Sequence, residues 1–475
     1  MNLAIKIKNK LSLVPIMWLF LMLVALWSTA IQNGAINRDG LGYLEQATYF
    51  IDYEWKKGFL FYPWPFFSLV IALLYKLTQI HIQIIAHALC FFMFGIAGYY
   101  YLKILELISS NNNIIFYGGL ILVSSIPIMD DYVGMILRDH GFWAACMAGT
   151  YYFILNRQQF QLSNSIKWQV SFFIGGLFRP ESFLFIFILP IWDYFANKSK
   201  NLRNMFKNYY LLIVLLSVLL LGLLLSNKFS YLILQSRFTD IFEVPFLVLK
   251  KLSNPLPIFS NDPMLSILIN DHTSIISLTI LLSIIFSKWI ASIGYLNFSI
   301  FGLSIFMNKI HMNEKTIRDI YFFTIVSFLI VLFNIFHVYV LSNRYWGFHL
   351  WWIYIITSYF LVILVNDKDI KNKFKWLISV MLIISISNVL LDKKENIEID
   401  VAKYINENSI TSIDYLDNER ISYYVNFNPF TFKDYHQKSK FNYKLIKSLD
   451  EESLLQIEKK FPDVNPKFYL IKNDE

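Results

Sequence analysis

The sequence predicts a polytopic α-helical membrane protein with a small α/β domain at its C-terminal end. Of its 475 residues, 56% are hydrophobic and only 16% are charged, which is too apolar for an ordinary soluble enzyme. Several apolar runs reach the roughly 20 residues needed to cross about 30 Å of hydrocarbon, whereas a membrane barrel would show short alternating segments. After residue 391 the chain becomes charged and contains no further run of this kind.

The first crossing is expected over residues 11–31, after the basic run KIKNK. With KIKNK on the cytoplasmic side, residues 32–62 form an outer loop. The segment 63–79 is short and begins with two prolines, so it is interpreted as an interfacial or re-entrant helix. A full crossing here would reverse the side on which every later loop lies.

Two short runs, 168–178 and 181–195, flank the sequence Arg179-Pro180-Glu181. A proline at this place predicts a tight helical hairpin with its tip at the membrane surface. The remaining crossings are expected near 82–102, 112–129, 141–156, 208–226, 273–287, 290–308, 319–341, 348–366 and 374–391.

These runs give about twelve crossings, which would leave the C-terminus inside. The lysine-rich segments 309–318 and 366–375 are typical of cytoplasmic loops, however, and they place residues 392–475 outside. One crossing is therefore miscounted, and we expect about 11–13 membrane helices over residues 1–391. Residues 229–249 could supply the difference. Charged residues there oppose this assignment, namely Arg237, Asp240 and Glu243.

The formal charge of +8 does not indicate nucleic acid, because much of the excess lies in short loops between apolar runs. Cys90 and Cys146 both fall inside apolar runs and form neither a disulfide framework nor a zinc spacing. No phosphate-binding glycine loop, dinucleotide fingerprint or hydrolase serine motif is present. The Asp, Glu and His inventory permits a divalent metal ion but does not specify one, and no cofactor is implied.

The C-terminal segment 392–475 is interpreted as a soluble α/β domain. A helix is expected in DVAKYINENS, a strand in SIDYLD, a helix or turn in ERISYYVN, helical segments in NYKLIKSLDEESLLQIEKKF and a final strand in KFYLIK.

The first outer loop contains the sequence RDGLGYLEQATYF, which places Asp39, Tyr43 and Glu45 at the mouth of the first crossing. If this stretch is helical, Asp39 and Tyr43 share one face. A carboxylate there can act as a general base toward an acceptor hydroxyl or amine. The alternative is a solvated cap of a helix beside the membrane. Lys57, in the same loop, is a candidate ligand contact or half of a solvated lysine pair.

A second group of polar residues, Arg138, Asp139 and His140, is expected on the same side of the membrane as Asp39. Acids beside an arginine suit a phosphorylated donor and its acceptor, because the guanidinium fork holds phosphate oxygens. The alternative is a local Arg–Asp pair at a helix end.

Arg179 with Glu181, and Arg344 with Tyr345, complete the candidate residues. An arginine in or near a membrane is costly and is usually paired or functional. Arg179 either pairs with Glu181 as a structural element or reaches a phosphate. The tryptophans after Arg344 are interpreted as a membrane-interface belt.

The order of these features resembles the membrane glycosyltransferases of the GT-C fold, which include protein O-mannosyltransferases and lipid A aminoarabinose transferases. Asp39 and Tyr43 match the first-loop motif of that family, whose aspartate is its base. Arg138-Asp139 is similar to the second outer-loop motif. The hairpin Arg179-Pro180-Glu181 and the pair Arg344-Tyr345 resemble the later arginine motifs, and the tail resembles the outer domain of bacterial members. The usual second acid beside the first aspartate is here Gly40.

The resemblance implies an inverting transfer of a sugar from a polyprenyl-phosphate donor to a lipid or glycan acceptor of a bacterial cell envelope, such as lipopolysaccharide. The reaction would take place on the outer face of the cytoplasmic membrane, and the partners would be membrane lipids rather than nucleic acid. Asp39 would be the base and Asp139 an acid that organises the site. Arg138, Arg179 and Arg344 would be the candidates for the phosphate.

Two other functions fit a polytopic bundle with outer-face arginines. A transporter or flippase of lipid-linked saccharides should show inverted repeats and ionisable residues along a path through the membrane. An O-antigen polymerase or ligase should have a large loop late in the chain instead of an acidic first loop.

Overall fold

The structure is a computed structural model. It describes residues 12–31, 36–62, 64–109, 111–196, 273–306, 315–338, 343–366, 372–391 and 397–408, together with residue 421 and four short strands. The chain divides into two compact units. The first comprises Met1–Leu26, Phe91–Val133 and Arg138–Leu391, and the second comprises Trp27–Cys90, Gly134–Leu137 and Asp392–Glu475.

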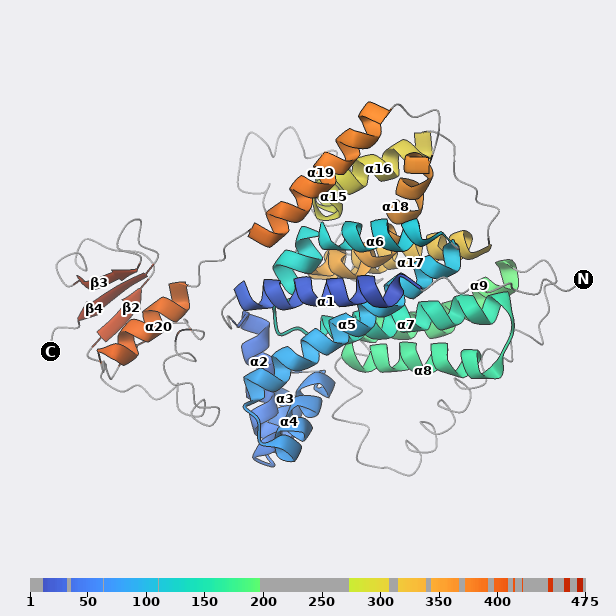
Figure 1. The fold of residues 1–475 in the computed structure, drawn as a ribbon. Helices are drawn as coiled ribbons and strands as arrows, with labels where there is room; N and C mark the ends of the chain where they lie inside the picture. The colour runs from blue at the N-terminus through green and yellow to red at the C-terminus, as the bar shows by residue number, and fades with distance from the viewer. Residues whose placement is uncertain are drawn as a thin grey trace, which may run out of the picture. The chain divides into compact units, whose positions relative to one another are not determined.

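Long apolar helices dominate the described part of the first unit (Figure 1). Two of its helices, α1 (Val14–Ile31) and α5 (Ile82–Ile108), continue into the second unit. The others are α6 (Asn112–Val123), α7 (Asp139–Gln158), α8 (Leu162–Phe178), α9 (Phe183–Ala196), α15 (Thr273–Ile293), α16 (Tyr295–Phe306), α17 (Lys315–Val338), α18 (Asn343–Asn366) and α19 (Asn372–Leu391). A π-helix, η1 (Ile126–Tyr132), follows α6, and a short 3₁₀ turn, η2 (Pro180–Ser182), joins α8 to α9.

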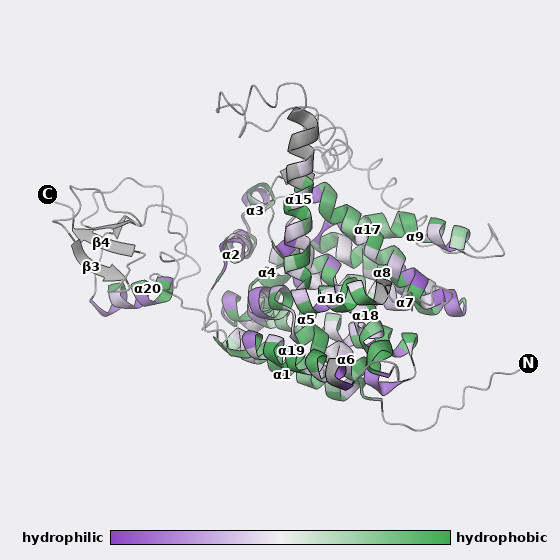
Figure 2. Cartoon of the chain, turned by 90° about the horizontal axis from the view of Figure 1, so that it is seen from above, coloured by the Kyte–Doolittle hydropathy of each residue, from purple (hydrophilic) through white to green (hydrophobic). Residues whose placement is uncertain are grey.

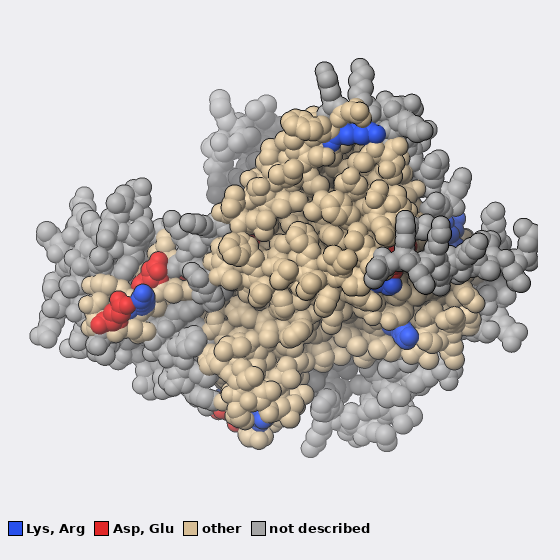
Figure 3. All heavy atoms as spheres, viewed as in Figure 1, with Lys and Arg blue, Asp and Glu red and all other residues tan. Residues whose placement is uncertain are grey.

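Several of these helices are long and apolar enough to cross a membrane. By length and composition, α1, α5, Lys315–Ile335 and Arg344–Asn366 qualify as single spans among the described residues. Two bent pairs, α6 with η1 and part of α15 with α16, raise the number to as many as six. The protein is therefore a multi-pass α-helical membrane protein. Charged side chains are few on the broad face of the helical part shown in Figure 3. In Figure 2, α17 and α19 are mainly apolar.

Each predicted apolar run in the described part of the chain overlaps a helix, but the boundaries differ by up to six residues, and the run 112–129 is divided between α6 and η1. The predicted runs 208–226 and 229–249, with Arg237, Asp240 and Glu243, lie outside the described residues. The runs 273–287 and 290–308 correspond to α15 and α16, but the chain bends by 98° between them. Gly294, at the bend, has a φ of +87°, a conformation that favours glycine. If the bent pair is one broken span, the number of crossings falls by one, which is the parity that the loop charges require.

Helix α18 lies at the centre of the first unit, in contact with α6, α15, α16 and α17. Its tryptophans, Trp346, Trp351 and Trp352, are all fully buried. The indole of Trp352 stacks on Phe323 of α17 with a centroid distance of 5.7 Å. The prediction of a membrane-interface belt is therefore wrong. A helix that is apolar all round is buried by its neighbours, so these aromatic side chains form core rather than interface.

The hairpin predicted around Pro180 is confirmed, since α8 contacts α9 on the far side of η2. Helices α7 and α8 lie side by side (Figure 1). Glycines permit this close approach, because a Cβ on Gly149 would fall 2.6 Å from the Phe172 ring. Helix α8 of the hairpin therefore packs closely against α7, whose first residue is Asp139.

In the second unit, the segment predicted as the first outer loop contains two helices, α2 (Arg38–Ile51) and α3 (Trp55–Phe61), and the predicted short segment 63–79 contains α4 (Phe66–Thr78). Helix α4 packs against α2, and its 13 residues are too few for an ordinary crossing. The short helix predicted over 63–79 is therefore confirmed as a helix, and its interfacial position stays a prediction. Hydrophilic residues are visible on α2 in Figure 2.

The C-terminal segment contains α20 (Ile397–Glu407) and the strands β1 (Ile413–Asp414), β2 (Tyr443–Ile446), β3 (Ile457–Phe461) and β4 (Phe468–Lys472). The sheet order is β1-β2-β4-β3, parallel between β1 and β2 and antiparallel elsewhere. Helix α20 contacts β3 and buries Val401, Ala402 and Ile405. Helix α20 and the strands β1 and β4 lie where the sequence analysis expected a helix and strands.

The helical segments predicted within 442–461 are wrong where β2 and β3 lie. Lysine, leucine and glutamate in this stretch favour helix by intrinsic propensity. Both strands pair with β4, however, and strand formation depends on cross-strand partners more than on local preference.

Candidate functional site

A fully buried carboxylate, Asp139, holds two arginines at the start of α7. Arg344 donates from Nε and Nη2 to Asp139 Oδ2, at 2.9 and 2.6 Å. Arg179 donates from Nη1 to the other oxygen, Oδ1. Charge-assisted bonds from guanidinium groups to a carboxylate are among the strongest that proteins form. Asp139 therefore fixes the position of both guanidinium groups.

Glu181, in the turn between α8 and α9, extends the network of hydrogen bonds around Asp139 and Arg179. Arg179 donates from Nη2 to Glu181 Oε1 at 2.9 Å, and Asn334 of α17 donates its amide to the same oxygen at 3.2 Å. Burial opposes ionisation of Glu181, but attraction to Arg179, a backbone hydrogen bond and the hydrogen bond from Arg179 together outweigh it and lower the pKa of the carboxyl. We call Asp139, Arg179, Glu181, Asn334 and Arg344 the Asp139 cluster. Its four charged members carry two positive and two negative charges.

Local sequence explains how Arg179 reaches Asp139. The residue before a proline is pushed out of helical conformation, and Arg179 has φ −147° and ψ 126° ahead of Pro180. This break ends α8 and turns the arginine out of the helix. Asp139 lies in the first turn of α7, where the helix dipole favours a negative charge.

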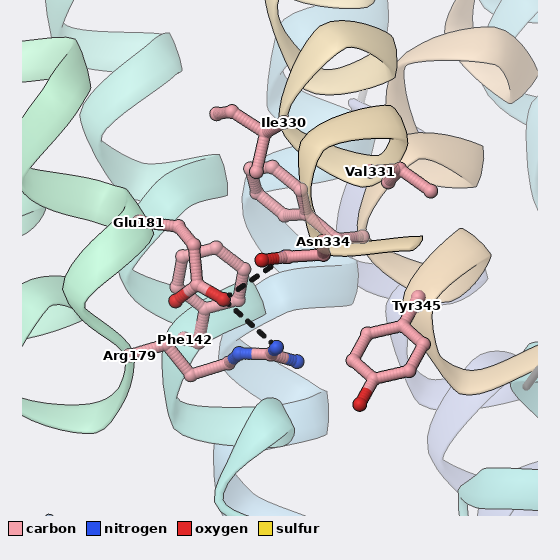
Figure 4. Close-up of a pocket in the computed structure, with 8 residues that line it drawn as sticks. Phe142, Arg179, Glu181, Ile330, Val331, Asn334 and Tyr345 are labelled. Carbon is pink, nitrogen blue, oxygen red and sulfur yellow. Dashed lines mark hydrogen bonds and ion pairs between the residues drawn. The ribbon is translucent and has the colours of Figure 1, made fainter. Parts of the chain in front are cut away.

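A pocket opens beside the Asp139 cluster, and Arg179, Glu181 and Asn334 form part of its wall (Figure 4). It is small: the space inside it that is open to a water-sized molecule is about 10 Å³, room for about one water. The guanidinium carbon of Arg179 lies 5.7 Å from the ring centroids of both Phe142 and Tyr345. The rest of the wall is aromatic and aliphatic: Phe142, Tyr345, Phe348, Ile330 and Val331.

A second group of buried charges joins the C-terminal end of α7 to α9 and to the N-terminal end of α17. Arg157, near the end of α7, pairs through Nε with Asp193 of α9 at 2.8 Å and through Nη1 with Asp319 of α17. Trp192 donates its indole N–H to Asp319 at 2.9 Å, and Lys315 donates to the Arg157 carbonyl. We call these five residues the Asp319 cluster. Along α7 the clusters are about 27 Å apart, at roughly 1.5 Å per residue.

Arg138 and His140 flank Asp139 in the sequence. Arg138 is the N-cap residue of α7, and its charge helps to lower the pKa of Glu181. His140 is fully buried, with its ring 5.2 Å from that of Trp143. The structure thus brings Arg138, Asp139, the hairpin pair and the pair at the start of α18 to one end of the first unit. The sequence analysis predicted that these motifs share a side.

The candidates from the first outer loop belong to the second unit. Asp39 is exposed in the first turn of α2. Tyr43 is buried and packs edge-to-face on Tyr62 and Phe67, at 5.6 and 5.3 Å. Its ring therefore stabilises the packing of α2 on α4.

Glu45 and Lys57 also have protein partners. The Tyr49 hydroxyl donates to Glu45 at 3.1 Å, and burial together with this carboxylate raises the pKa of Tyr49 to about 12. Lys57 forms a 3.1 Å pair with Glu54, and its side chain is 67% exposed. Lys57 is thus largely solvated and pairs with Glu54, and a ligand contact of this residue stays a prediction.

Sequence reasoning missed Asn334 and the whole Asp319 cluster. The available signal was a polar residue within an apolar run, as at Asn334 in VLFNIF and Asp193 in PIWDYF. Such residues are functional candidates by default in membrane proteins. Arg157 and Asp319 were overlooked because they stand at the ends of runs, where solvation by a loop is the simpler expectation.

Among the residues that the structure describes, no group of three or more His, Cys, Asp and Glu side chains is placed to hold a metal ion. Comparisons with known protein families and with curated proteins find no match to this chain.

Proposed function

We propose that the protein is an integral-membrane glycosyltransferase of the GT-C type. In this proposal it transfers a sugar from a polyprenyl-phosphate donor to a lipid or glycan acceptor of the cell envelope. The observation that carries the proposal is the pair of arginines, Arg179 and Arg344, held by one buried carboxylate, with Arg179 lining a small pocket.

This arrangement suits a phosphate that leaves with negative charge. A guanidinium group binds phosphate oxygens through a planar fork of donors. Asp139 orients Arg179 and Arg344 before the ligand arrives, so little reorganisation is needed when charge develops on the leaving group. Arg138 at the N-terminus of α7 adds positive charge at the same end.

Asp39 is the proposed general base. In a single displacement its carboxylate accepts the proton of the acceptor hydroxyl or amine, and the acceptor atom forms a bond to the anomeric carbon. The bond from that carbon to the phosphate oxygen breaks, and the phosphate departs with the electron pair. Inversion at the anomeric carbon follows. The exposure of Asp39 in the first turn of α2 leaves its carboxylate accessible to an acceptor.

Loop charge supports the proposed orientation in the cytoplasmic membrane. The Asp319 cluster lies next to the lysine-rich segment 309–318, which favours the cytoplasmic side. The Asp139 cluster, at the other end of α7, is then on the outer face, together with residues 392–475. Lipid-linked donors serve that face because nucleotide sugars are cytoplasmic.

A transporter of lipid-linked saccharides is the second candidate, and the Asp319 cluster favours it. Helix α7 carries a buried ionisable residue at each end, Asp139 and Arg157, and ionisable residues along the membrane are a feature of transport paths. The two functions differ in their product. A glycosyltransferase moves the sugar from the lipid phosphate to an acceptor, whereas a transporter moves the intact lipid-linked sugar across the membrane.

The test compares purified wild type with Asp39→Asn, using polyprenyl-phosphate sugars and membrane glycolipids as substrates. Loss of a general base is expected to lower transfer by about 10²–10⁴-fold. Stability should be unchanged because Asp39 is exposed. Asp52→Asn, at the other end of α2, is the matched control and should remain active. An equally active Asp39→Asn would place the base elsewhere. Movement of lipid-linked sugar across vesicles without transfer would favour the transporter.

A further inference from the structure

We infer that the protein binds a sodium ion where its two bent helix pairs meet α18. The ligands are neutral oxygen atoms: side-chain oxygens of Ser292, Asn297 and Tyr354, together with backbone carbonyls at the end of α15. This inference is independent of the proposed function, because none of these residues belongs to the Asp139 cluster. All of them lie in the first unit.

The bend between α15 and α16 turns the last carbonyls of α15 toward α18. The chain changes direction by 98° at Gly294. The carbonyl oxygens of Ser292 and Ile293 lie 3.5 and 3.3 Å from the Tyr354 hydroxyl, and the Asn297 amide donates to Ile293 at 3.1 Å. Ser292 and Ile293 are buried. The C-terminal end of α15, which carries partial negative charge, therefore ends inside the bundle.

The same tyrosine contacts the second bent pair. Ser125 precedes η1 at the 52° bend that follows α6, and its Oγ lies 2.9 Å from the Tyr354 hydroxyl. Tyr354 thus gathers oxygen atoms from both bends. Irregular backbone at membrane depth is tolerated where it is buried in protein or lines a cavity, and carbonyls at such breaks bind Na⁺ in transporters.

Two further oxygen atoms at this place, Ser292 Oγ and Asn297 Oδ1, are buried without a hydrogen-bond partner among the described residues. Each residue is only 2% exposed. Both are tied to the group by their other polar atoms: Ser292 through its carbonyl, and Asn297 through Ile293 and a side-chain interaction with the Tyr354 hydroxyl. An unpaired buried polar atom is costly. A cation satisfies several oxygen acceptors at once without supplying protons.

The type and spacing of the oxygens favour Na⁺ over other cations. None of the proposed ligands is a carboxylate, whereas divalent cations are usually held by carboxylates. Oxygens about 2.3–2.6 Å from an ion the size of Na⁺ or Ca²⁺, at right angles to each other, are about 3.3–3.7 Å apart. The distances of 3.3 and 3.5 Å from the Tyr354 hydroxyl to the two carbonyls fall in this range. The larger K⁺ requires a wider spacing.

The experiment measures binding of radioactive sodium to the purified full chain in lipid nanodiscs, with choline replacing Na⁺ to keep the ionic strength constant and K⁺ as competitor. Wild type should bind Na⁺ saturably, and K⁺ should compete only weakly. Ser292→Ala removes one ligand oxygen and should weaken Na⁺ affinity by about 10-fold, as expected for one contact to a charged group. Asn297→Leu should weaken it at least as much.

Ser68→Ala is the matched control, because Ser68 on α4 is also a fully buried serine whose hydroxyl has no partner among the described residues. It should keep the wild-type affinity. Asn297→Leu also removes the bond to Ile293, so Ser292→Ala decides if that variant does not fold. Absence of saturable Na⁺ binding to folded wild type, equal affinity for K⁺, or unchanged affinity in Ser292→Ala would overturn the sodium site. None of these results bears on the proposed sugar transfer, which Asp39→Asn tests separately.

Discussion

The Asp139 cluster and the Asp319 cluster share two helices, α7 and α17, and differ in what surrounds their charges. Helix α7 supplies Asp139 to one and Arg157 to the other, and α17 supplies Asn334 and Asp319. The side chains of Arg157, Asp193 and Asp319 are at most 9% exposed. In the Asp139 cluster, Glu181 and Arg344 are 17% and 18% exposed.

The difference lies in the aromatic residues near each cluster. At the Asp319 cluster, Trp192 stacks on Phe322 at 4.2 Å and donates to Asp319, which closes the site. At the Asp139 cluster, Phe142 and Tyr345 stand apart as walls of a pocket. Buried ion pairs are weak evidence for net stability, so a cluster next to a pocket is the better candidate for ligand binding. We interpret the Asp319 cluster as a structural ion-pair network that holds α7, α9 and α17 together.

Removal of the central carboxylate should have the largest effect at either cluster. Asp139→Asn and Asp319→Asn each remove one counter-charge from a buried arginine, while Arg179 keeps Glu181 and Arg157 keeps Asp193. Breaking a buried pair typically costs about 3–5 kcal/mol of unfolding free energy, and the remaining partner should keep each loss near or below the lower end of that range. Denaturant unfolding in detergent measures both losses. Binding of undecaprenyl phosphate should separate them, since only Asp139→Asn should abolish it under conditions where the variants remain folded. Equal loss of binding would mean that both clusters serve the ligand.

Arginine-to-lysine exchange should have an intermediate effect and should distinguish the two clusters more sharply. Lysine keeps the charge but lacks the planar fork. Arg344→Lys should weaken undecaprenyl phosphate binding by about 10- to 100-fold, as expected for the loss of about 1.5–3 kcal/mol in a charged hydrogen bond. Arg157→Lys should lower stability with unchanged affinity. A weaker affinity in Arg157→Lys alone would reverse the assignment of structural and ligand-binding clusters.

The pH dependence of stability should show the smallest effect. The pKa of Glu181 is lowered in the folded protein, chiefly because the pairing with Arg179 outweighs burial. Its stabilising contribution is therefore present above the ordinary glutamate pKa of about 4.3 and is lost as the pH falls through the lower folded-state value. The difference in unfolding free energy between wild type and Glu181→Gln should be constant near neutrality and should shrink below about pH 4. A difference that grows on acidification would contradict the ion pair.

Local features of the sequence were enough to predict much of the fold. Apolar runs placed the described membrane helices, because the length of hydrocarbon to be crossed is fixed. Pro180 placed the break that turns Arg179 out of α8, through a steric restriction on the preceding residue. The prediction failed where partners decide the structure, as for β2 and β3, which depend on pairing with β4.

For the candidate site as well, some features could be predicted from local sequence and others depend on helix packing. Hydropathy is enough to predict a multi-pass helical protein and to identify the residues that burial in a membrane makes costly, including Asp139, Arg179 and Arg344. Helix packing, in contrast, brings to Asp139 two arginines that lie 40 and 205 positions away along the chain. It also decided that the tryptophans of α18 are core and that Asn334 reaches Glu181. The physical reason is that hydropathy and proline sterics act within a few residues, whereas ion pairing and burial depend on which helices pack together.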